Sequence, residues 1–237
     1  MKISMKTPIR TAAMVLILSA CNLYNPYDGN LPVPETPPSS DTGVPAPSPP
    51  PVIAIGDCKE DATISQCLAL KFIAYRSGSQ DPTLEKIEAD ALVGGMNRVW
   101  KPCGIGFTLE WFEIVDPTAY RLAYSPDWRT ESQRIRETFA DPERFLIVAV
   151  GPWNISTIAV TQMPGTGPYG VLVEEDFATN ELTVGHELGH YMGLYHYRNT
   201  TNLMNPYIGS DTEALTPSQC EIARDTNVRF WTPMQRL

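Results

Sequence analysis

The sequence is poor in histidine and in positive charge. Its 237 residues include only three histidines, and 18 Lys and Arg stand against 27 Asp and Glu, for a net charge of −9. Proteins that bind nucleic acids need a basic surface to neutralise phosphates, so we expect no nucleic-acid partner. The sequence also lacks any run of roughly 20 apolar residues, the length that a membrane-spanning helix requires. With 43% hydrophobic residues, it has the composition of a folded protein.

The start of the chain is typical of an export signal. Basic residues precede the short apolar stretch 12–20, and LSAC (18–21) follows. LSAC resembles a bacterial lipobox, and this resemblance implies cleavage before Cys21, which then carries acyl chains inserted in a lipid bilayer. Asn22 favours the outer membrane of a bacterial cell envelope over the inner one. The alternative is an ordinary secretory signal that leaves a free thiol at Cys21.

Proline is concentrated next to this signal. Residues 32–51 contain nine of the 22 prolines and no aromatic residue, which favours an extended, semi-rigid chain rather than a folded unit. We therefore expect a signal peptide at 1–20, a proline-rich stalk at 21–51 and one domain at 52–237. A tail without function would have the same composition as the stalk.

Cysteine is also scarce, and its number is odd. Removing Cys21 from the five leaves four, an even set suited to two disulfides in an oxidising compartment. Four cysteines allow three connectivities. We favour Cys58–Cys67, which closes a local loop, and Cys103–Cys220, which ties the C-terminal end to the middle of the sheet.

The order of predicted elements indicates an α/β fold with a mixed sheet. Apolar patterns predict strands at 68–75, 105–115, 145–150 and 169–175. Helices are predicted from Asp81 to Trp100, over 129–139, over the histidine-containing stretch and from a capping box at 216–219. The strand at 169–175 is the natural candidate for an edge strand along which an extended substrate lies, with Glu174 and Glu175 favouring basic substrate residues.

The three histidines lie together in HELGHYMGLYH (186–196). His186 and His190 are one helical turn apart and point to the same side, so they can bind one metal ion. His196 would lie about 9 Å beyond His190 if the helix continued. The helix must therefore end between them, and Gly193 is suited to the turn. Three imidazoles with a fourth position left for water describe a catalytic zinc site.

The same stretch resembles a known family. HELGHYMGLYH matches HExxHxxGxxH, the signature of the metzincin zinc endopeptidases. This resemblance implies a metzincin-like fold with a twisted mixed sheet, an active-site helix and a small C-terminal subdomain. It implies that the three histidines bind one Zn²⁺ and that Glu187 is the general base for a zinc-activated water. It also implies that Gly193 ends the helix and that Met204, in NLMNPY (202–207), is the Met-turn residue.

The sequence departs from the family in several places. Tyr197, after the third histidine, fits no subfamily. In some subfamilies a tyrosine two residues after the methionine stabilises the transition state, but that position is Pro206 here, and Tyr207 is the nearest candidate. No histidine remains for a second histidine-bound zinc. The carboxylates of 174–177, or Asp211 and Glu213, are candidates for Ca²⁺. The enzyme could be kept latent by a side chain that reaches back to the zinc. Candidates for this side chain are Asp28, Asp41 and an unpaired Cys58.

These features predict a monomeric zinc endopeptidase, tethered by lipid, that cleaves protein or peptide substrates. The main alternative is a binding module that keeps the fold and the zinc but holds a peptide without cutting it. Glu187 favours the enzyme, because a binding module has no need of a general base. A zinc hydrolase acting on another acyl bond is the third candidate.

Overall fold

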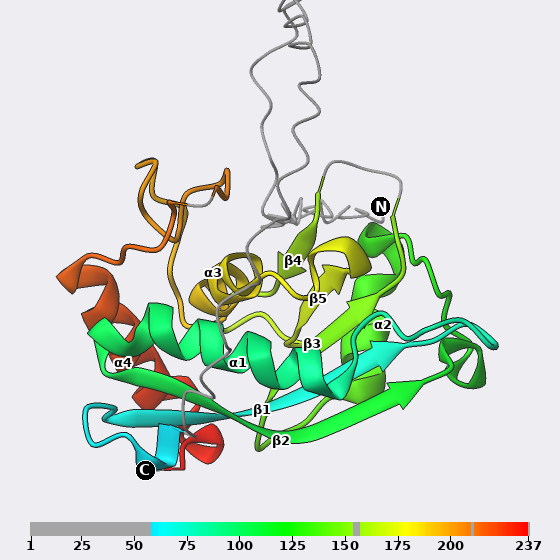
Figure 1. The fold of residues 1–237 in the computed structure, drawn as a ribbon, viewed down its shortest axis with the longest axis horizontal. Helices are drawn as coiled ribbons and strands as arrows, with labels where there is room; N and C mark the ends of the chain where they lie inside the picture. Colours follow the sequence, from blue (N-terminus) through cyan, green and yellow to red (C-terminus); the bar gives the residue numbers. More distant parts are fainter. Residues whose placement is uncertain (1–57, 154–156, 210, 237) are drawn as a thin grey trace, which may run out of the picture.

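The computed structural model describes residues 58–153, 157–209 and 211–236 (Figure 1). The expected signal peptide and stalk, with Cys21, Asp28 and Asp41, lie outside the described residues. Within them, no helix has the length and apolar character needed to cross a membrane.

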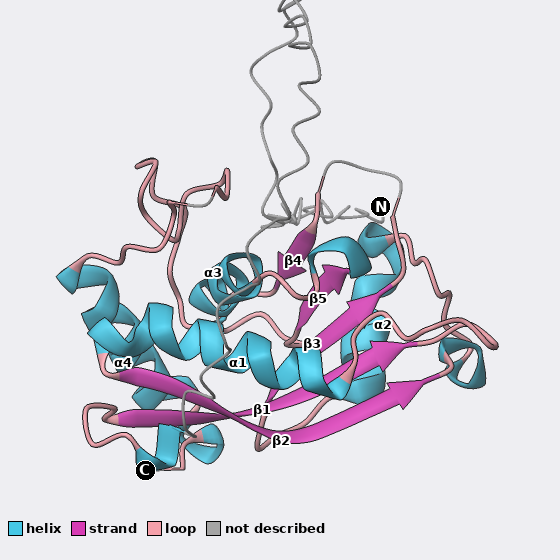
Figure 2. Cartoon of the chain, in the orientation of Figure 1, coloured by secondary structure: helices cyan, strands magenta, loops and turns pink. Residues whose placement is uncertain are grey.

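A five-stranded sheet forms the centre of the domain (Figure 2). Its strands are β1 (Gln66–Tyr75), β2 (Ile105–Val115), β3 (Phe145–Val150), β4 (Ala159–Thr161) and β5 (Val171–Glu174). They are ordered β2-β1-β3-β5-β4, with β4 antiparallel to β5 and every other pair parallel. The expected α/β class with a mixed sheet is therefore confirmed.

The expectation that residues 169–175 form an edge strand is wrong. β5 is flanked by β3 and β4, and the edge on this side is β4. β4 has only three residues, all buried, and strands this short show no periodicity that could predict them. The sequence therefore identified β5 but assigned it the position that β4 occupies.

In the part of the chain that the structure describes, four α-helices cover the two faces of the sheet: α1 (Lys86–Trp100), α2 (Trp128–Phe139), α3 (Glu181–Tyr191) and α4 (Pro217–Phe230). The predicted start of the first helix at Asp81 is wrong, because α1 begins at Lys86 after a capping box between Glu85 and Glu88. The preceding residues are held out of the helix by Thr83. Its hydroxyl accepts a hydrogen bond from Tyr75 N at 3.0 Å and donates one to Ala149 O at 2.9 Å, so it joins the ends of β1 and β3.

Two apolar cores lie on opposite faces of the sheet. Successive residues of a strand point to opposite faces, so Phe72 and Ile147 join the core that contains α1, α3 and α4, whereas Ile73 and Val148 join the one that contains α2. In Figure 1, α1 runs across the sheet beside α3. The helix that carries the histidines therefore packs beside α1 on the same face of the sheet, where it contacts β4 and β5.

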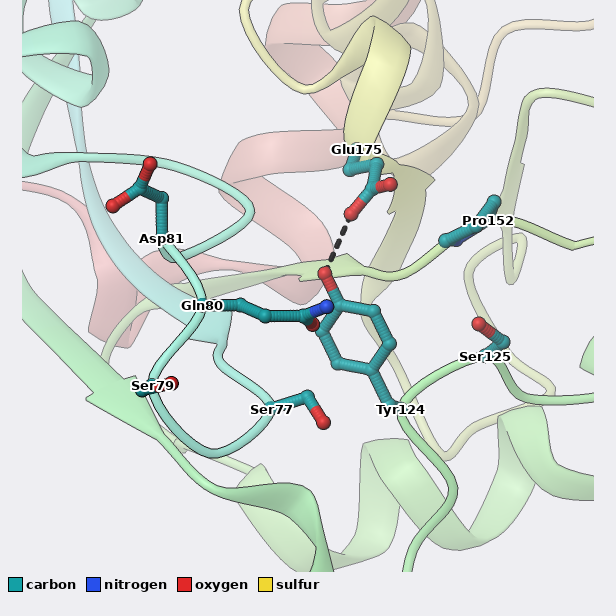
Figure 3. Close-up of a pocket in the computed structure, with 8 residues that line it drawn as sticks. All are labelled: Ser77, Ser79, Gln80, Asp81, Tyr124, Ser125, Pro152 and Glu175. Atoms are coloured by element: carbon teal, nitrogen blue, oxygen red, sulfur yellow. Dashed lines mark hydrogen bonds between the residues drawn. The ribbon is translucent and has the colours of Figure 1, made fainter.

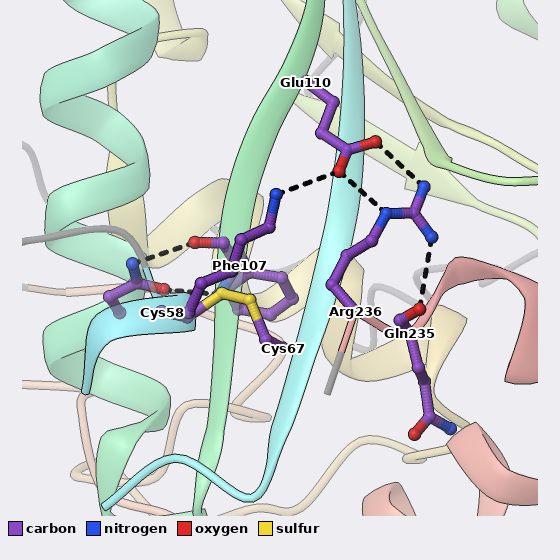
Figure 4. Close-up of a disulfide and its surroundings, with 8 residues drawn as sticks. Cys58, Cys67, Phe107, Glu110, Gln235 and Arg236 are labelled. Carbon is purple, nitrogen blue, oxygen red and sulfur yellow. Dashed lines mark hydrogen bonds and ion pairs between the residues drawn. A yellow bond between two sulfur atoms is a disulfide. The ribbon is translucent and has the colours of Figure 1, made fainter. Parts of the chain in front are cut away.

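The cysteines form the two favoured pairs. Cys58–Cys67 joins a 3₁₀ turn to the start of β1, and Cys103–Cys220 joins the segment before β2 to α4 (Figure 4 shows the first). Because Cys58 is bonded to Cys67, it has no thiol to offer as a latency ligand. The second disulfide reaches the beginning of β2 rather than the middle of the sheet, since Cys103 lies in the 3₁₀ turn Lys101–Cys103.

Candidate metal centre

Helix α3 begins and ends through identifiable local contacts. Asn180 caps its first turn, accepting a hydrogen bond from Thr183 N at 2.9 Å. The helix ends at Gly193, whose φ is +86°, in the left-handed region that favours glycine. The amide of Gly193 donates to His190 O at 2.9 Å, and that of Leu194 donates to Gly189 O at 2.9 Å. The chain turns back at the position that the sequence indicated.

This turn brings His196 to the other two histidines. One ring nitrogen from each of His186, His190 and His196 lies within 4.8 Å of the others. The Nε2 atoms of His190 and His196 are 3.2 Å apart. Two nitrogen ligands of a tetrahedral zinc, each at about 2.05 Å, lie about 3.3 Å apart. The geometry therefore suits a single small divalent ion.

The outer nitrogens of two rings are held by backbone carbonyls. His186 Nδ1 lies 2.6 Å from Leu203 O, and His190 Nδ1 lies 2.7 Å from Leu194 O. A carbonyl can only accept, so each Nδ1 carries the proton and each Nε2 presents its lone pair to the shared space. His186 and His190 are buried, whereas His196 is exposed, so the centre opens to solvent on the side of His196.

Burial also keeps the imidazoles neutral, which is the form that binds metal. Burial, together with the neighbouring histidines, lowers the pKa of His186 to about 3 and that of His196 to about 4. The pKa of His190 is lowered by burial as well. The donor set is thus ready for a cation at neutral pH.

Met204 lies directly beneath the helix. Met204 is fully buried, and a Cβ on Gly189 would clash with its Sδ and Cε atoms. Glycine at the fourth position of HELGH is therefore required for this close approach, a role that the sequence analysis missed. The repeated small residue inside a buried helix was the available signal.

Side-chain hydrogen bonds hold the turn that carries Met204. Asn202 Oδ1 accepts from Met204 N at 2.9 Å. Asn202 and Gln219 also form a pair, in which Asn202 Nδ2 donates to Gln219 Oε1 at 2.8 Å and Gln219 Nε2 donates to Asn202 Oδ1 at 3.0 Å. Gln219 is in addition the third residue of α4 and forms the predicted capping box with Thr216. The beginning of α4 is thereby tied to the turn that supplies the carbonyl for His186.

Glu187 lies next to the first histidine and is 7% exposed. Burial raises its pKa to about 7, against the lowering effects of Thr161 and of the Arg136 charge. The Thr161 hydroxyl is itself buried, and within the described residues it makes no hydrogen bond of good geometry. A carboxyl group in such a position can exchange a proton near neutral pH.

The remaining candidates from the sequence are not gathered at this centre. Tyr207 is 69% exposed. Glu174 accepts a hydrogen bond from Trp153 N at 3.1 Å, and Glu175 accepts one from Tyr124 Oη at 2.6 Å. Over the described ranges, the three histidines are the one group of three or more potential metal ligands; the carboxylates of 174–177 and of Asp211 and Glu213 form no such group there, and calcium binding stays a prediction.

A separate pocket of about 770 Å³ lies beyond the carboxyl ends of β1, β3 and β5 (Figure 3). It is lined by Ser77, Ser79, Gln80, Asp81, Tyr124, Ser125, Pro152 and Glu175. The hydrogen bond between Tyr124 and Glu175 crosses it. No histidine lines this pocket, so it is distinct from the metal centre.

Comparison with known proteins shows a likeness to solved structures and none to known sequences. No protein-family model matches the sequence, and no curated protein matches it. Among solved structures, the chain is similar to the crystal structure of metalloproteinase-II from Bacteroides fragilis, with a TM-score of 0.49 and 14% sequence identity. The match covers 70% of this chain and 55% of that one, so this chain spans about half the length of that structure.

Proposed function

We propose that the protein is a zinc-dependent endopeptidase that hydrolyses peptide bonds in extended protein substrates. The observation that carries the proposal is the convergence of His186, His190 and His196, with nitrogen spacing suited to zinc, beside the buried carboxyl group of Glu187. The match of residues 186–196 to the metzincin signature supports it. We also propose, from the sequence alone, that acylated Cys21 anchors the protein in a bacterial envelope.

The donor set fits zinc. Imidazole nitrogens are preferred zinc ligands, and three of them leave a fourth coordination position available for chemistry. When bound, zinc supplies Lewis-acid polarisation of a carbonyl group and lowers the pKa of water. The carbonyls of Leu203 and Leu194 fix the orientation of two of the ligand rings.

Glu187 is the residue that moves a proton. Glu187 directly follows His186 on α3, and we propose that its carboxyl group reaches the water on the open side of the histidine cluster. There it accepts a proton from the attacking water and returns it to the nitrogen of the leaving amine. Because it is 7% exposed, bulk water does not compete for this proton exchange.

The edge strand β4 offers a template for the substrate backbone. Glu174 N donates to Ile158 O at 3.0 Å, so these two residues form a hydrogen-bonded pair of the antiparallel ladder. Such pairs alternate along the ladder, which makes Val160 the next hydrogen-bonded residue. Ala159 and Thr161 therefore direct their backbone groups away from β5. An extended peptide could pair with these groups as an added strand, with Thr161 next to Glu187.

The alternative is a zinc-loaded module that binds a peptide in the same place without cutting it. The buried Glu187 favours the enzyme. Burying a carboxyl group lowers the stability of the fold, and a role in the reaction explains why it is nevertheless buried. A hydrolase of other acyl bonds ranks third, because an edge strand recognises a peptide backbone rather than a small amide.

The test is casein cleavage by the full-length chain, with its zinc content measured. We expect cleavage that is lost with 1,10-phenanthroline, and lost in Glu187→Ala while that variant still holds one zinc. Glu181→Ala, which removes a carboxylate from the first turn of the same helix, is the matched control and should keep activity. A folded, zinc-loaded wild type that cuts neither casein nor a diverse peptide library would refute the endopeptidase and favour the binding module.

A further inference from the structure

Arg136 is the buried charge that the proposed reaction leaves unexplained. It belongs to α2, on the face of the sheet opposite to α3, and only 5% of it is exposed. Burial lowers the pKa of its guanidinium to about 10, so it remains charged at neutral pH. No carboxylate in the described part of the chain forms an ion pair with it. A buried and unpaired cation is expensive, so its contacts are of interest.

Those contacts are two backbone carbonyls at the end of the sheet. Arg136 Nε donates to Gly170 O at 2.8 Å, and Nη2 donates to Val160 O at 3.3 Å. Val160 lies in β4, and Gly170 directly precedes β5. One guanidinium therefore bridges both ends of the 162–169 loop that connects these strands.

The backbone at Gly170 is shaped for this bridge. Its φ of +151° is one that residues with a side chain rarely adopt. A Cβ at this position would lie 3.2 Å from Arg136 Cγ and 3.0 Å from Leu146 Cδ2. The arginine stem thus packs directly against the Gly170 backbone, and its contact with β4 is part of a close-packed arrangement rather than a loose surface contact.

The bridge matters because β4 is short. Its three residues pair with β5 alone, and β5 itself has only four residues. Few ladder hydrogen bonds can form over that length, so the bond from Arg136 to Val160 O, anchored by the second bond to Gly170 O, is a large share of what holds β4 in place. The next residue after Val160 is Thr161, whose hydroxyl borders Glu187.

We propose that Arg136 is a positioning residue that holds β4 in register and so presents its outer edge to the backbone of an extended peptide substrate. This inference rests on the proposed endopeptidase function. It assigns to α2 a role in substrate binding although the helix lies on the far side of the sheet from the histidines. Arg136 itself contacts neither the substrate nor the metal ion.

The test compares Arg136→Met and Arg136→Lys with a matched control. Arg224→Met is that control, because Arg224 also donates to a backbone carbonyl, Cys103 O at 2.7 Å, but far from β4. Each full-length, zinc-loaded variant is examined by amide hydrogen exchange and by kinetics on a long peptide. Circular dichroism verifies that each variant is folded, and measurements are made at a temperature well below its melting point.

For Arg136→Met we expect amide exchange in β4 and β5 to be about tenfold faster than in wild type, as the loss of charge-assisted hydrogen bonds implies. We expect KM for the long peptide to rise by about tenfold with kcat changed much less. Arg136→Lys, which keeps the charge and one donor, should recover part of both effects. Arg224→Met should change neither, although it lowers stability.

Exchange and KM in Arg136→Met that equal those of Arg224→Met would overturn the inference. A fall in kcat with unchanged KM would also overturn it, because it would place the effect on the reaction rather than on substrate binding. If the wild type cleaves nothing, the proposed function fails, and the exchange measurement still decides whether Arg136 holds β4. If the wild type cleaves and the variants do not differ, the function stands without this role for Arg136.

Discussion

The pair between Asn202 and Gln219 offers a sharp test of how the fold supports the metal centre. Replacing Gln219 by Met keeps the length of the side chain but removes both hydrogen bonds to Asn202 and the one that Gln219 Oε1 accepts from Thr216 N at 2.8 Å. It also leaves Nδ2 of Asn202, a residue that is 2% exposed, without a partner, while Asn202 Oδ1 keeps the hydrogen bond from Met204 N.

The expected cost follows from these contacts. Each lost hydrogen bond contributes about 1 kcal/mol, and an unpaired buried amide adds about 1–3 kcal/mol. We therefore expect Gln219→Met, which removes three hydrogen bonds and leaves one buried amide nitrogen unpaired, to lower the free energy of unfolding by roughly 4–6 kcal/mol. Gln133→Met is the control, because Gln133 is an exposed residue of α2 that hydrogen-bonds only to Glu137, and its loss should cost less than about 0.5 kcal/mol.

The same substitution should weaken zinc binding. Asn202 holds the amide of Met204, and the adjacent Leu203 supplies the carbonyl that orients His186. Loss of an outer partner of a zinc ligand typically lowers metal affinity about 10–100-fold. Because Leu203 N is also held by Ala214 O at 2.8 Å, we expect a value near the lower end.

Urea unfolding measures the free energy of unfolding, and competition with a chromophoric chelator measures the zinc affinity. If stability falls but zinc affinity does not, α4 is not coupled to the ligand His186 and this reasoning is refuted. If neither changes, the buried pair is not the support that its distances indicate.

Three further perturbations address other parts of the molecule. Gly193→Ala should cost roughly 2–3 kcal/mol in urea unfolding, because φ is +86° and a Cβ would lie 2.8 Å from a threonine hydroxyl of α4. Gly94→Ala, in α1 with nothing within 4 Å of its Cβ, should instead raise the free energy of unfolding. If Gly94→Ala proves less stable than Gly193→Ala, the steric argument for Gly193 is refuted. Glu110, whose pKa is lowered from 4.5 to about 2 chiefly by hydrogen bonds from Arg236, contributes stability above pH 4.5 that is lost as the pH falls through about 2. Glu110→Gln should therefore lose at most about 3 kcal/mol at pH 7, and the gap to wild type should close in acid; a gap independent of pH would contradict this. Removing the disulfide with Cys103→Ser should cost about 5 kcal/mol by the loop-entropy relation for its separation of 117 residues, against about 2.6 kcal/mol for the nine-residue separation of the other disulfide. Equal losses for the two disulfides would show that loop entropy does not govern them.

The parts of the site that could be predicted from the sequence are those encoded locally. The spacing of His186 and His190 and the glycine at 193 define a helix, its end and the return of His196 within eleven residues. The capping box at Thr216 is local as well, and α4 begins where it predicts. Such patterns specify structure without knowledge of distant residues.

The features that were missed depend on distant partners. Arg136 falls in a charged amphipathic stretch, where a charged residue is normally solvent-facing, and only the packing of α2 against the ends of β4 and β5 buries it. The start of α1 was misplaced because Thr83 is held by β1 and β3. β4 was missed because its extended conformation depends on pairing with β5 rather than on its own sequence.

The end of the described chain is part of the same sheet. Gln235 forms an antiparallel bridge with Leu68 of β1, Arg236 N donates to Cys67 O at 2.8 Å, and the Arg236 guanidinium binds Glu110 of β2 through both of its carboxylate oxygens (Figure 4). The first and second strands therefore acquire all their partners only when residues some 160 positions further along are present, as the 161-residue separation of Gln66 and Asn227 also illustrates. Contacts this remote in sequence slow folding. During synthesis, the nascent chain cannot complete this sheet until nearly all of the domain has left the ribosome, so the first two strands stay incompletely paired until the end of the domain arrives.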